Sequence, residues 1–175
     1  MTAIPSAEKI RSLLDYDQKT GSFVWKARPG SSSFKKSMVG KAAGSAHSSG
    51  YLAISLHGKK YLAHHLAWVH FYGSWPPAYI DHINLNKRDN RIANLRLATP
   101  GQNSANASLR CDNTSGYRGV RFEPRRKKWI AVLHHEGKTR QLGSFATPEM
   151  AAAAYAREAY KKFGDFCPSY VLEAA

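Results

Sequence analysis

The sequence has few cysteines, few acidic residues and no long apolar run. Its two cysteines, Cys111 and Cys167, lie outside any CxxC pair, and no metal-spaced histidine pair accompanies them. Two thiols cannot complete a four-ligand zinc site, so we interpret both as reduced and structural. No apolar segment approaches the roughly 20 residues of a membrane-spanning helix, and the N-terminus lacks a secretory apolar core. These absences predict a cytoplasmic protein with no membrane partner.

The shortage of acidic residues leaves a large positive charge. Lys and Arg number 26 against 12 Asp and Glu, which gives a formal net charge of +14 at pH 7. Such an excess is typical of proteins that bind polyanions. Nucleic acid is the first expectation, and an anionic membrane surface is the alternative. The length of 175 residues is enough for one ordinary domain or two small ones, and the hydrophobic content of 43% is normal for a folded protein.

Polar residues are concentrated between residues 79 and 106, around two short apolar runs. The first run predicts a strand end that presents Asp81 and His82 side by side, and Leu95–Ala98 predicts a second strand. A helix is expected next, because Thr99 is a suitable N-cap with proline following it and Gln102 completes a capping box. Asn103 then falls in the first turns of that helix. Strand, loop, strand and helix form a compact unit that brings two oxygen ligands for a hard cation beside an imidazole. This arrangement outlines a metal-assisted phosphodiesterase site.

The same residues resemble a known family. Asp81-His82, Asn94 and Asn103 are similar to the ββα-metal motif of HNH endonucleases, in the phage and intron-encoded branch that has asparagine in place of the last histidine. The resemblance implies that His82 is the general base, that Asp81 and Asn103 hold one divalent ion, Mg²⁺ or Mn²⁺, and that Asn94 pins the loop. Residues 61–68 are similar to the helix before the motif. Each histidine of this helix, taken singly, would more often be a packing or surface residue, and His64 is the best candidate for a supporting role.

Two features of this region have simpler interpretations. Asp, His and Asn are common in turns, and any one of these residues alone would more often be a turn residue than a ligand. Four of them in the family's spacing favour the site. Asn84, Asn86 and Asn90 are interpreted as turn residues without chemistry. The family usually has arginine where this chain has His65.

The C-terminal third predicts a small sheet with one helix. Strands are expected over residues 117–122, 128–134 and 139–142, and a helix from Thr147 to Gly164. Residues 116–141 contain eight Lys or Arg against two Glu, whereas residues 144–175 contain three against four Asp or Glu. The sheet is therefore expected to meet the polyanion.

This segment, from Ser115-Gly-Tyr-Arg-Gly-Val-Arg121 to Phe163-Gly164, resembles the ethylene-response-factor type of DNA-binding domain. The resemblance implies that the sheet lies in the major groove. His134 and Gln141 replace an arginine and a tryptophan that are common in that family, so its target sequence is not carried over. The residues expected to contact DNA are Arg118, Arg121, Arg125, Arg126, Lys128, Trp129 and Arg140. Solvated surface charge is the simpler interpretation for each basic residue taken singly.

We therefore predict an α+β protein with an HNH nuclease domain at 1–108, a linker at 109–115 and an ethylene-response-factor-like domain at 116–172. The expected function is that of a metal-dependent, homing-type endonuclease that nicks or cleaves double-stranded DNA in a bacterial or phage-infected cell, as a monomer or DNA-assembled dimer. A non-catalytic DNA-binding regulator with the same two domains is the alternative. An RNA-binding factor fits the charge but not a groove-reading sheet, because the A-form major groove is too narrow.

Overall fold

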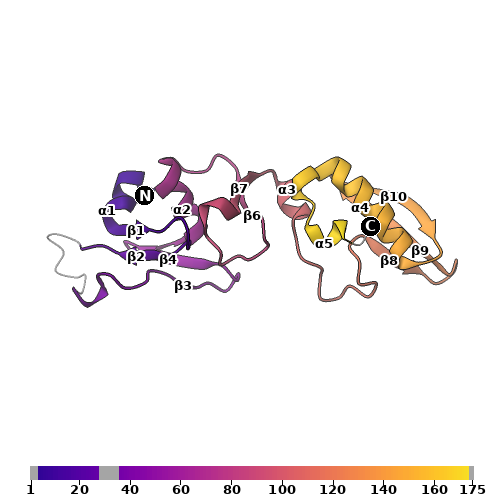
Figure 1. Ribbon diagram of the computed structural model, residues 1–175, viewed down its shortest axis with the longest axis horizontal. Helices are drawn as coiled ribbons and strands as arrows, with labels where there is room; N and C mark the ends of the chain where they lie inside the picture. Colours follow the sequence, from indigo (N-terminus) through magenta and orange to yellow (C-terminus); the bar gives the residue numbers. More distant parts are fainter. Residues whose placement is uncertain (1–3, 28–35, 174–175) are drawn as a thin grey trace. The chain divides into compact units, whose positions relative to one another are not determined.

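The computed structural model describes residues 4–27 and 36–173, and it divides the chain into two compact units, Met1–Leu97 and Ala98–Ala175 (Figure 1). Helices and strands occur in both units, which makes the fold α+β as predicted. Each unit has its own hydrophobic core. The predicted domain limits of 1–108, 109–115 and 116–172 remain a prediction. The units divide within the motif region, and α3 (Pro100–Ala105) belongs to the second unit.

The first unit combines two helices with short antiparallel strands. α1 (Ala7–Leu13) begins at the N-cap Ser6, whose hydroxyl accepts a hydrogen bond from the Lys9 amide, and it packs against α2. The remaining elements of the unit are β1 (Leu14–Tyr16), β2 (Phe23–Trp25), η1 (Lys36–Met38), β3 (Ser45–Ala46), β4 (Leu52–Leu56), β5 (Lys59–Leu62), α2 (Ala63–Tyr72), β6 (Tyr79–His82), η2 (Ile92–Asn94) and β7 (Leu95–Ala98). The strand pairs are β1 with β2, β3 with β4, β4 with β5, and β6 with β7.

The hairpin of β4 and β5 and the helix after it follow directly from the sequence. His57 and Gly58 both have positive φ (49° and 79°), as expected for the tight turn between paired strands. α2 follows the hairpin directly and ends at Gly73, which has φ of 80°. Leu66, Ala67 and Val69 on α2 are fully buried and anchor the core of the first unit.

The ββα segment begins with the predicted strands β6 and β7. The helix α3 that follows has the predicted capping box, because the Thr99 hydroxyl accepts from the Gln102 amide while the Gln102 side chain accepts from the Thr99 amide. Pro100 occupies the first turn, where a missing N–H costs nothing. These local signals were sufficient to predict the helix start correctly.

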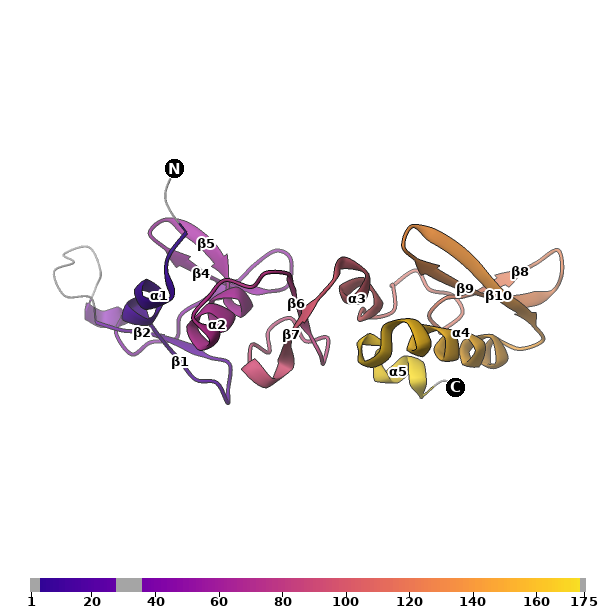
Figure 2. The ribbon, with the colours of Figure 1, turned by 90° about the horizontal axis from the view of Figure 1, so that it is seen from above.

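In the second unit a three-stranded antiparallel sheet is covered by a helix on one side (Figure 2). The three predicted strands are β8 (Val120–Glu123), β9 (Lys128–His135) and β10 (Lys138–Phe145), and their order β10-β9-β8 makes the sheet a meander. α4 (Pro148–Phe163) begins at the N-cap Thr147 and ends at Gly164, also as predicted. The short elements η3 (Gly164–Phe166) and α5 (Ser169–Leu172) complete the unit.

The two faces of this sheet differ in character. Val120, Ala131 and Leu133 pack with alanines of α4 in the core. Residues opposite each other on paired antiparallel strands share a face, and neighbours along a strand alternate. The pairs Arg121 with Ile130, Val132 with Gln141, and His134 with Thr139 therefore lie on the other face. We call the face turned away from α4 the open face.

Candidate active site

The site begins with Asp81 and His82 at the end of β6. Both are buried, with 4% and 5% of their surface exposed. The Arg96 Nε on the paired strand β7 donates to the Asp81 Oδ2 at 2.8 Å. A buried carboxylate needs such a partner, because desolvation of an unpaired charge is costly. The ββ hairpin thus holds a desolvated carboxylate directly beside an imidazole.

Asn90 orients the His82 ring. The Asn90 Nδ2 donates to the Arg88 carbonyl at 3.2 Å, which leaves the amide oxygen to face the His82 Nε2 at 3.4 Å. An amide oxygen can only accept a hydrogen bond. This arrangement favours the tautomer with the proton on Nε2.

Asn94 connects the two ends of the loop between β6 and β7. Its Oδ1 accepts from the Asn84 backbone amide at 3.0 Å, and its Nδ2 donates to the Asp89 carbonyl at 2.8 Å. The Asn94 carbonyl also accepts from the Ile83 amide at 3.0 Å. Asn94 is itself buried, with 6% exposure. Its side chain therefore acts on the backbone and holds the loop closed next to His82.

Three histidines are clustered in the first unit. The ring of His64, on α2, lies 5.0 Å from the ring of His82 and 4.4 Å from that of His65. The Tyr51 ring packs against two of them, with its centre 4.9 Å from that of the His64 ring and 5.7 Å from that of the His82 ring. The His64 Nδ1 is buried and has no hydrogen-bond partner among the residues that the structure describes. These contacts place His64 against His82, where a supporting residue is expected.

Burial keeps these imidazoles neutral. It lowers the pKa of His64 to about 3, with further lowering by the charges of His65 and His82. Burial also lowers the pKa of His82 below its ordinary value, although the bond to Asn90 and the charge of Asp81 act in the opposite direction. A neutral imidazole at pH 7 is the form that can accept a proton.

The β1–β2 hairpin supports the Asn90 loop from behind. The Tyr16 hydroxyl donates to the Asn90 carbonyl at 2.7 Å, and burial raises the pKa of Tyr16 to about 12. Gly21, in the hairpin turn, lies so close to the loop that a Cβ there would be 2.4 Å from the Arg91 nitrogen. Its φ of 73° also favours glycine. Any larger residue would displace the segment that orients His82.

Asn103 lies on α3 in the second unit, and its backbone N–H donates to the Thr99 carbonyl at 2.9 Å. The metal site that it would share with Asp81 remains a prediction. Within residues 4–27 and 36–173, no three His, Cys, Asp or Glu side chains gather as a metal cluster. One carboxylate and one amide oxygen nevertheless fit Mg²⁺ or Mn²⁺, hard ions that take the rest of their ligands from water and phosphate. The donor chemistry is therefore suitable for the ion that the motif implies.

Part of the predicted DNA-contacting set lies on the open face. Arg121 and Lys128 project from β8 and β9 on this face, and Arg125 and Arg126 are exposed in the turn between these strands. A hollow of about 500 Å³ is lined by Arg121, Glu123, Arg125, Arg126, Ile130 and Gln141. This surface presents basic groups to solvent, as a phosphate-binding surface requires.

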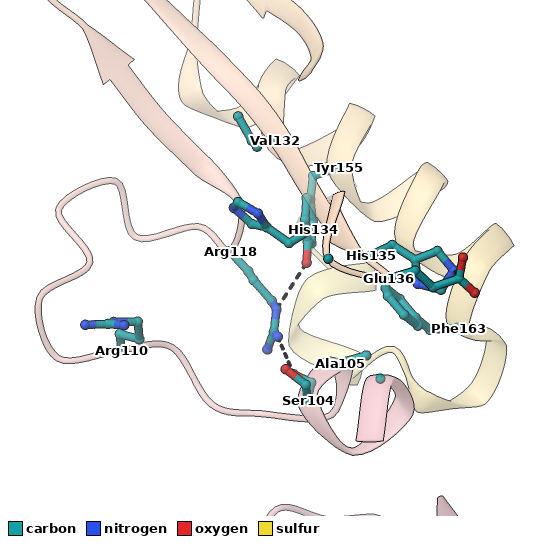
Figure 3. Close-up of a pocket in the computed structure, with 13 residues that line it drawn as sticks. Ser104, Ala105, Arg110, Arg118, Val132, His134, His135, Glu136, Tyr155 and Phe163 are labelled. Carbon is teal, nitrogen blue, oxygen red and sulfur yellow. Dashed lines mark hydrogen bonds and ion pairs between the residues drawn. The ribbon is translucent and has the colours of Figure 1, made fainter. Parts of the chain in front are cut away.

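The other three predicted residues do not lie on the open face, and their contact with DNA remains a prediction. Trp129 packs against the core on the helix side and lies 5.0 Å from Phe122. Arg140 is opposite Leu133 on the helix-covered face and reaches Glu158 of α4 at 3.9 Å. Arg118 precedes β8 and points inward (Figure 3). The sequence prediction treated the charged strands as one surface, whereas strand alternation divides them between two faces.

Sequence reasoning missed two residues of the site. Arg96 was not assigned any role, yet it pairs with Asp81. Asn90 was interpreted as a turn residue, yet it is 1% exposed and contacts His82. The position of Arg96 in a strand of otherwise apolar residues was a usable signal for a buried partner. Asn90 offered none, because its neighbours in the sequence are ordinary turn formers.

Comparison with known proteins places this site in a family. Residues 61–105, which include the whole β6–β7 hairpin and α3, match the family described as HNH endonuclease. Protein 3.8 of Escherichia phage T7 is 37% identical over 90 residues, 50% of this chain and 74% of the phage protein. An uncharacterized HNH endonuclease of Acanthamoeba polyphaga mimivirus is 40% identical over 88 residues, 50% of this chain and 44% of that protein. The chain therefore belongs to the HNH endonuclease family.

A solved structure of the HNH homing endonuclease I-HmuI, which concerns DNA binding and cleavage by that enzyme, is also similar. The similarity extends over 91% of this chain and 82% of the I-HmuI chain, with 20% sequence identity and a TM-score of 0.41.

None of the helices within the described ranges, 4–27 and 36–173, is long and apolar enough to cross a membrane.

Proposed function

We propose that the protein is a metal-dependent endonuclease that hydrolyses phosphodiester bonds of double-stranded DNA, with recognition aided by the C-terminal sheet. The observation that carries the proposal is the buried Asp81-His82 pair, in which His82 is neutral and oriented by Asn90. The family match, the viral relatives and the basic open face also support it. We place its action in the cytoplasm of a bacterial or phage-infected cell.

In the proposed reaction His82 acts as the general base. A water oxygen attacks phosphorus while its proton moves to the His82 imidazole, and the bond between phosphorus and the 3′ oxygen breaks. The 3′ oxygen leaves with the bonding electrons and takes a proton from solvent. Asp81 and Asn103 would hold a divalent ion, which neutralises charge on the phosphate and the leaving oxygen when bound. Asn94 keeps the loop closed, so that His82 stays in position.

A non-catalytic DNA-binding regulator is the second candidate. The observation that favours it is the ion pair between Arg96 and Asp81, since a guanidinium already neutralises the carboxylate that the ion would need. Against it, a regulator has no use for a neutral, oriented imidazole beside that carboxylate.

Supercoiled plasmid with magnesium or manganese, with and without EDTA, separates the two functions. The nuclease is expected to nick or linearise the plasmid only with the metal. His82→Ala should lose about 10²–10⁴ in rate and retain DNA affinity, because a general base makes no phosphate contact in the ground state. His57→Asn, at an exposed hairpin turn where asparagine tolerates positive φ, is the matched histidine control. Cleavage by His82→Ala at the wild-type rate, or cleavage in EDTA, would contradict the mechanism.

A further inference from the structure

Arg118 is engaged inside the second unit. Its Nε donates to the Tyr155 hydroxyl at 3.1 Å, its Nη1 to the Ala107 carbonyl at 2.6 Å and its Nη2 to the Ser104 carbonyl at 2.6 Å. Figure 3 shows the guanidinium between Tyr155 and Ser104, at the wall of a cavity of about 520 Å³. Each of its three nitrogens therefore already has a partner in the protein.

The two carbonyls belong to the C-terminal end of α3. Ser104 lies in the last turn of this helix and Ala107 just beyond it. Carbonyls at a helix C-terminus lack partners within the helix and carry partial negative charge, so a guanidinium is a suitable cap. The Ala107 carbonyl also accepts from the Tyr170 hydroxyl at 2.5 Å. The end of α3 is thus attached both to the segment before β8 and to α5.

Tight packing holds the Tyr155 partner in place. A Cβ on Gly119 would lie 2.2 Å from the Tyr155 ring and 2.7 Å from the Val132 carbonyl, and Gly119 has φ of 67°. The Val132 amide also donates to the Gly119 carbonyl at 2.7 Å. Only glycine allows the segment after Arg118 to approach Tyr155 this closely. The position of Arg118 is therefore set by the fold of the second unit.

We propose that Arg118 is a positioning residue of the nuclease site, because it fastens α3, the helix that carries Asn103, to the sheet of β8, β9 and β10 with α4 and α5, which we call the C-terminal module. This inference rests on the proposed function. α3 has only six residues, too few to be stable in water without contacts at its ends. The Thr99–Gln102 capping box holds its beginning, and Arg118 with Tyr170 holds its end. The C-terminal module accordingly supports the chemistry as well as DNA binding.

The alternative role for Arg118 is a DNA contact, as the sequence resemblance implies. The two roles differ in what the substitution Arg118→Met changes, because methionine keeps an apolar stem and removes all donors. Loss of a residue that fastens α3 lowers the stability of this helix, whereas loss of a DNA contact lowers the affinity for DNA. Arg121→Met is the matched control, since Arg121 lies on the open face and 59% of its side chain is exposed.

The experiment compares wild type, Arg118→Met, Arg118→Lys, Tyr170→Phe and Arg121→Met in the full chain. Amide hydrogen exchange of residues 103–106 is measured without DNA or metal, DNA affinity is measured in EDTA, and single-turnover cleavage is measured with saturating DNA over a magnesium titration. Loss of a charge-assisted hydrogen bond corresponds to at least about a tenfold change in a local opening equilibrium. Arg118→Met should therefore exchange at least about tenfold faster at α3.

In cleavage, Arg118→Met should be slower at saturating DNA and need more magnesium for half its maximal rate, with DNA affinity close to wild type. Arg118→Lys, which keeps the charge, should recover part of both losses, and Tyr170→Phe should show a smaller effect of the same kind. Arg121→Met should lose affinity and leave exchange at α3 unchanged. If Arg118→Met does not fold, Tyr170→Phe alone tests the attachment through exchange.

Two results would overturn the proposal. Unchanged exchange at α3, together with a loss of affinity equal to that of Arg121→Met, would make Arg118 a DNA contact. Faster exchange with wild-type cleavage and magnesium dependence would show that the attachment does not serve the site. Absence of cleavage by wild type would instead refute the proposed nuclease function, and the exchange result would still report on the attachment of α3.

Discussion

The two compact units differ in whether their functional polar side chains are buried or exposed to solvent. In the first unit Asp81, His82, Asn90 and Asn94 are buried and held by side-chain or backbone partners. In the second unit the arginines and lysines of the open face and its turn are exposed to solvent. Burial keeps an imidazole neutral and fixes its orientation, so that it is ready to accept a proton. Exposure leaves charges hydrated and mobile, which is sufficient for attraction to phosphate but sensitive to salt.

The largest stability effect is expected at the buried ion pair. Arg96→Ala should destabilise the first unit by about 3 kcal/mol, because it leaves the Asp81 carboxylate desolvated without its cation. Arg91→Ala is the matched control: Arg91 pairs with Asp89, but half of its side chain is exposed, so the loss should be about 0.2–1 kcal/mol. Urea unfolding followed by tryptophan fluorescence measures both, since Trp25, Trp68 and Trp75 report on this unit.

Magnesium sharpens this test. If Asp81 is a metal ligand, millimolar magnesium should stabilise Arg96→Ala more than wild type, because the ion supplies the positive charge that the guanidinium supplied. Equal destabilisation by Arg96→Ala and Arg91→Ala would contradict the contrast between buried and exposed pairs. Equal stabilisation of Arg96→Ala and wild type by magnesium would contradict the assignment of Asp81 as a metal ligand.

The next effect concerns the exposed face and separates base reading from phosphate attraction. Arg121→Ala should cost roughly 1–3 kcal/mol on a preferred duplex and less on a scrambled one, if Arg121 reads a base. Lys127→Asn should weaken both duplexes equally and reduce the salt slope by about 1, as loss of a phosphate contact does. Asparagine suits position 127 because Lys127 has φ of 50° in the turn.

Binding titrations at several salt concentrations measure these differences. Equal losses on both duplexes for Arg121→Ala would make the open face an electrostatic surface without sequence selectivity.

The smallest effect is a pH dependence of stability in the loop beside the site. The hydrogen bond from Arg91 holds the pKa of Asp89 down to about 2, with a further contribution from Asn84. A depressed pKa stabilises the fold when the carboxylate is ionised, so this contribution is present above the ordinary pKa and is lost as pH falls from about 4 to about 2.

Denaturant unfolding of Asp89→Asn and wild type across this range isolates the effect. The difference in stability between them should shrink as pH falls, and a constant difference would show that the Arg91 bond does not depend on charge.

Much of the fold was predictable because its signals are local. The capping box at Thr99, the His57-Gly58 turn and the Thr147 and Gly164 ends of α4 each depend on a few adjacent residues. Such residues satisfy or break backbone hydrogen bonds directly, whatever lies elsewhere in the chain. The succession of strand, strand and helix from Tyr79 onwards follows from the same kind of signal, as does the meander of the second unit.

Side-chain partners were not predictable in the same way. A basic residue in a strand has the same sequence character whether it lies on the open face, as Arg121 does, or on the face covered by α4, as Arg140 does. Strand register and the packing of α4 decide which face is open, and both depend on the whole unit.

The sequence by itself determined the spacing of Asp81, His82, Asn94 and Asn103, the positions of the elements that carry them, and the excess of positive charge. Only the tertiary structure decided that Arg96 neutralises Asp81, that Asn90 orients His82, and that Arg118 holds the end of α3. Local propensity acts over a few residues, whereas these contacts join separate elements, and their strength comes from burial that exists only after the chain has folded.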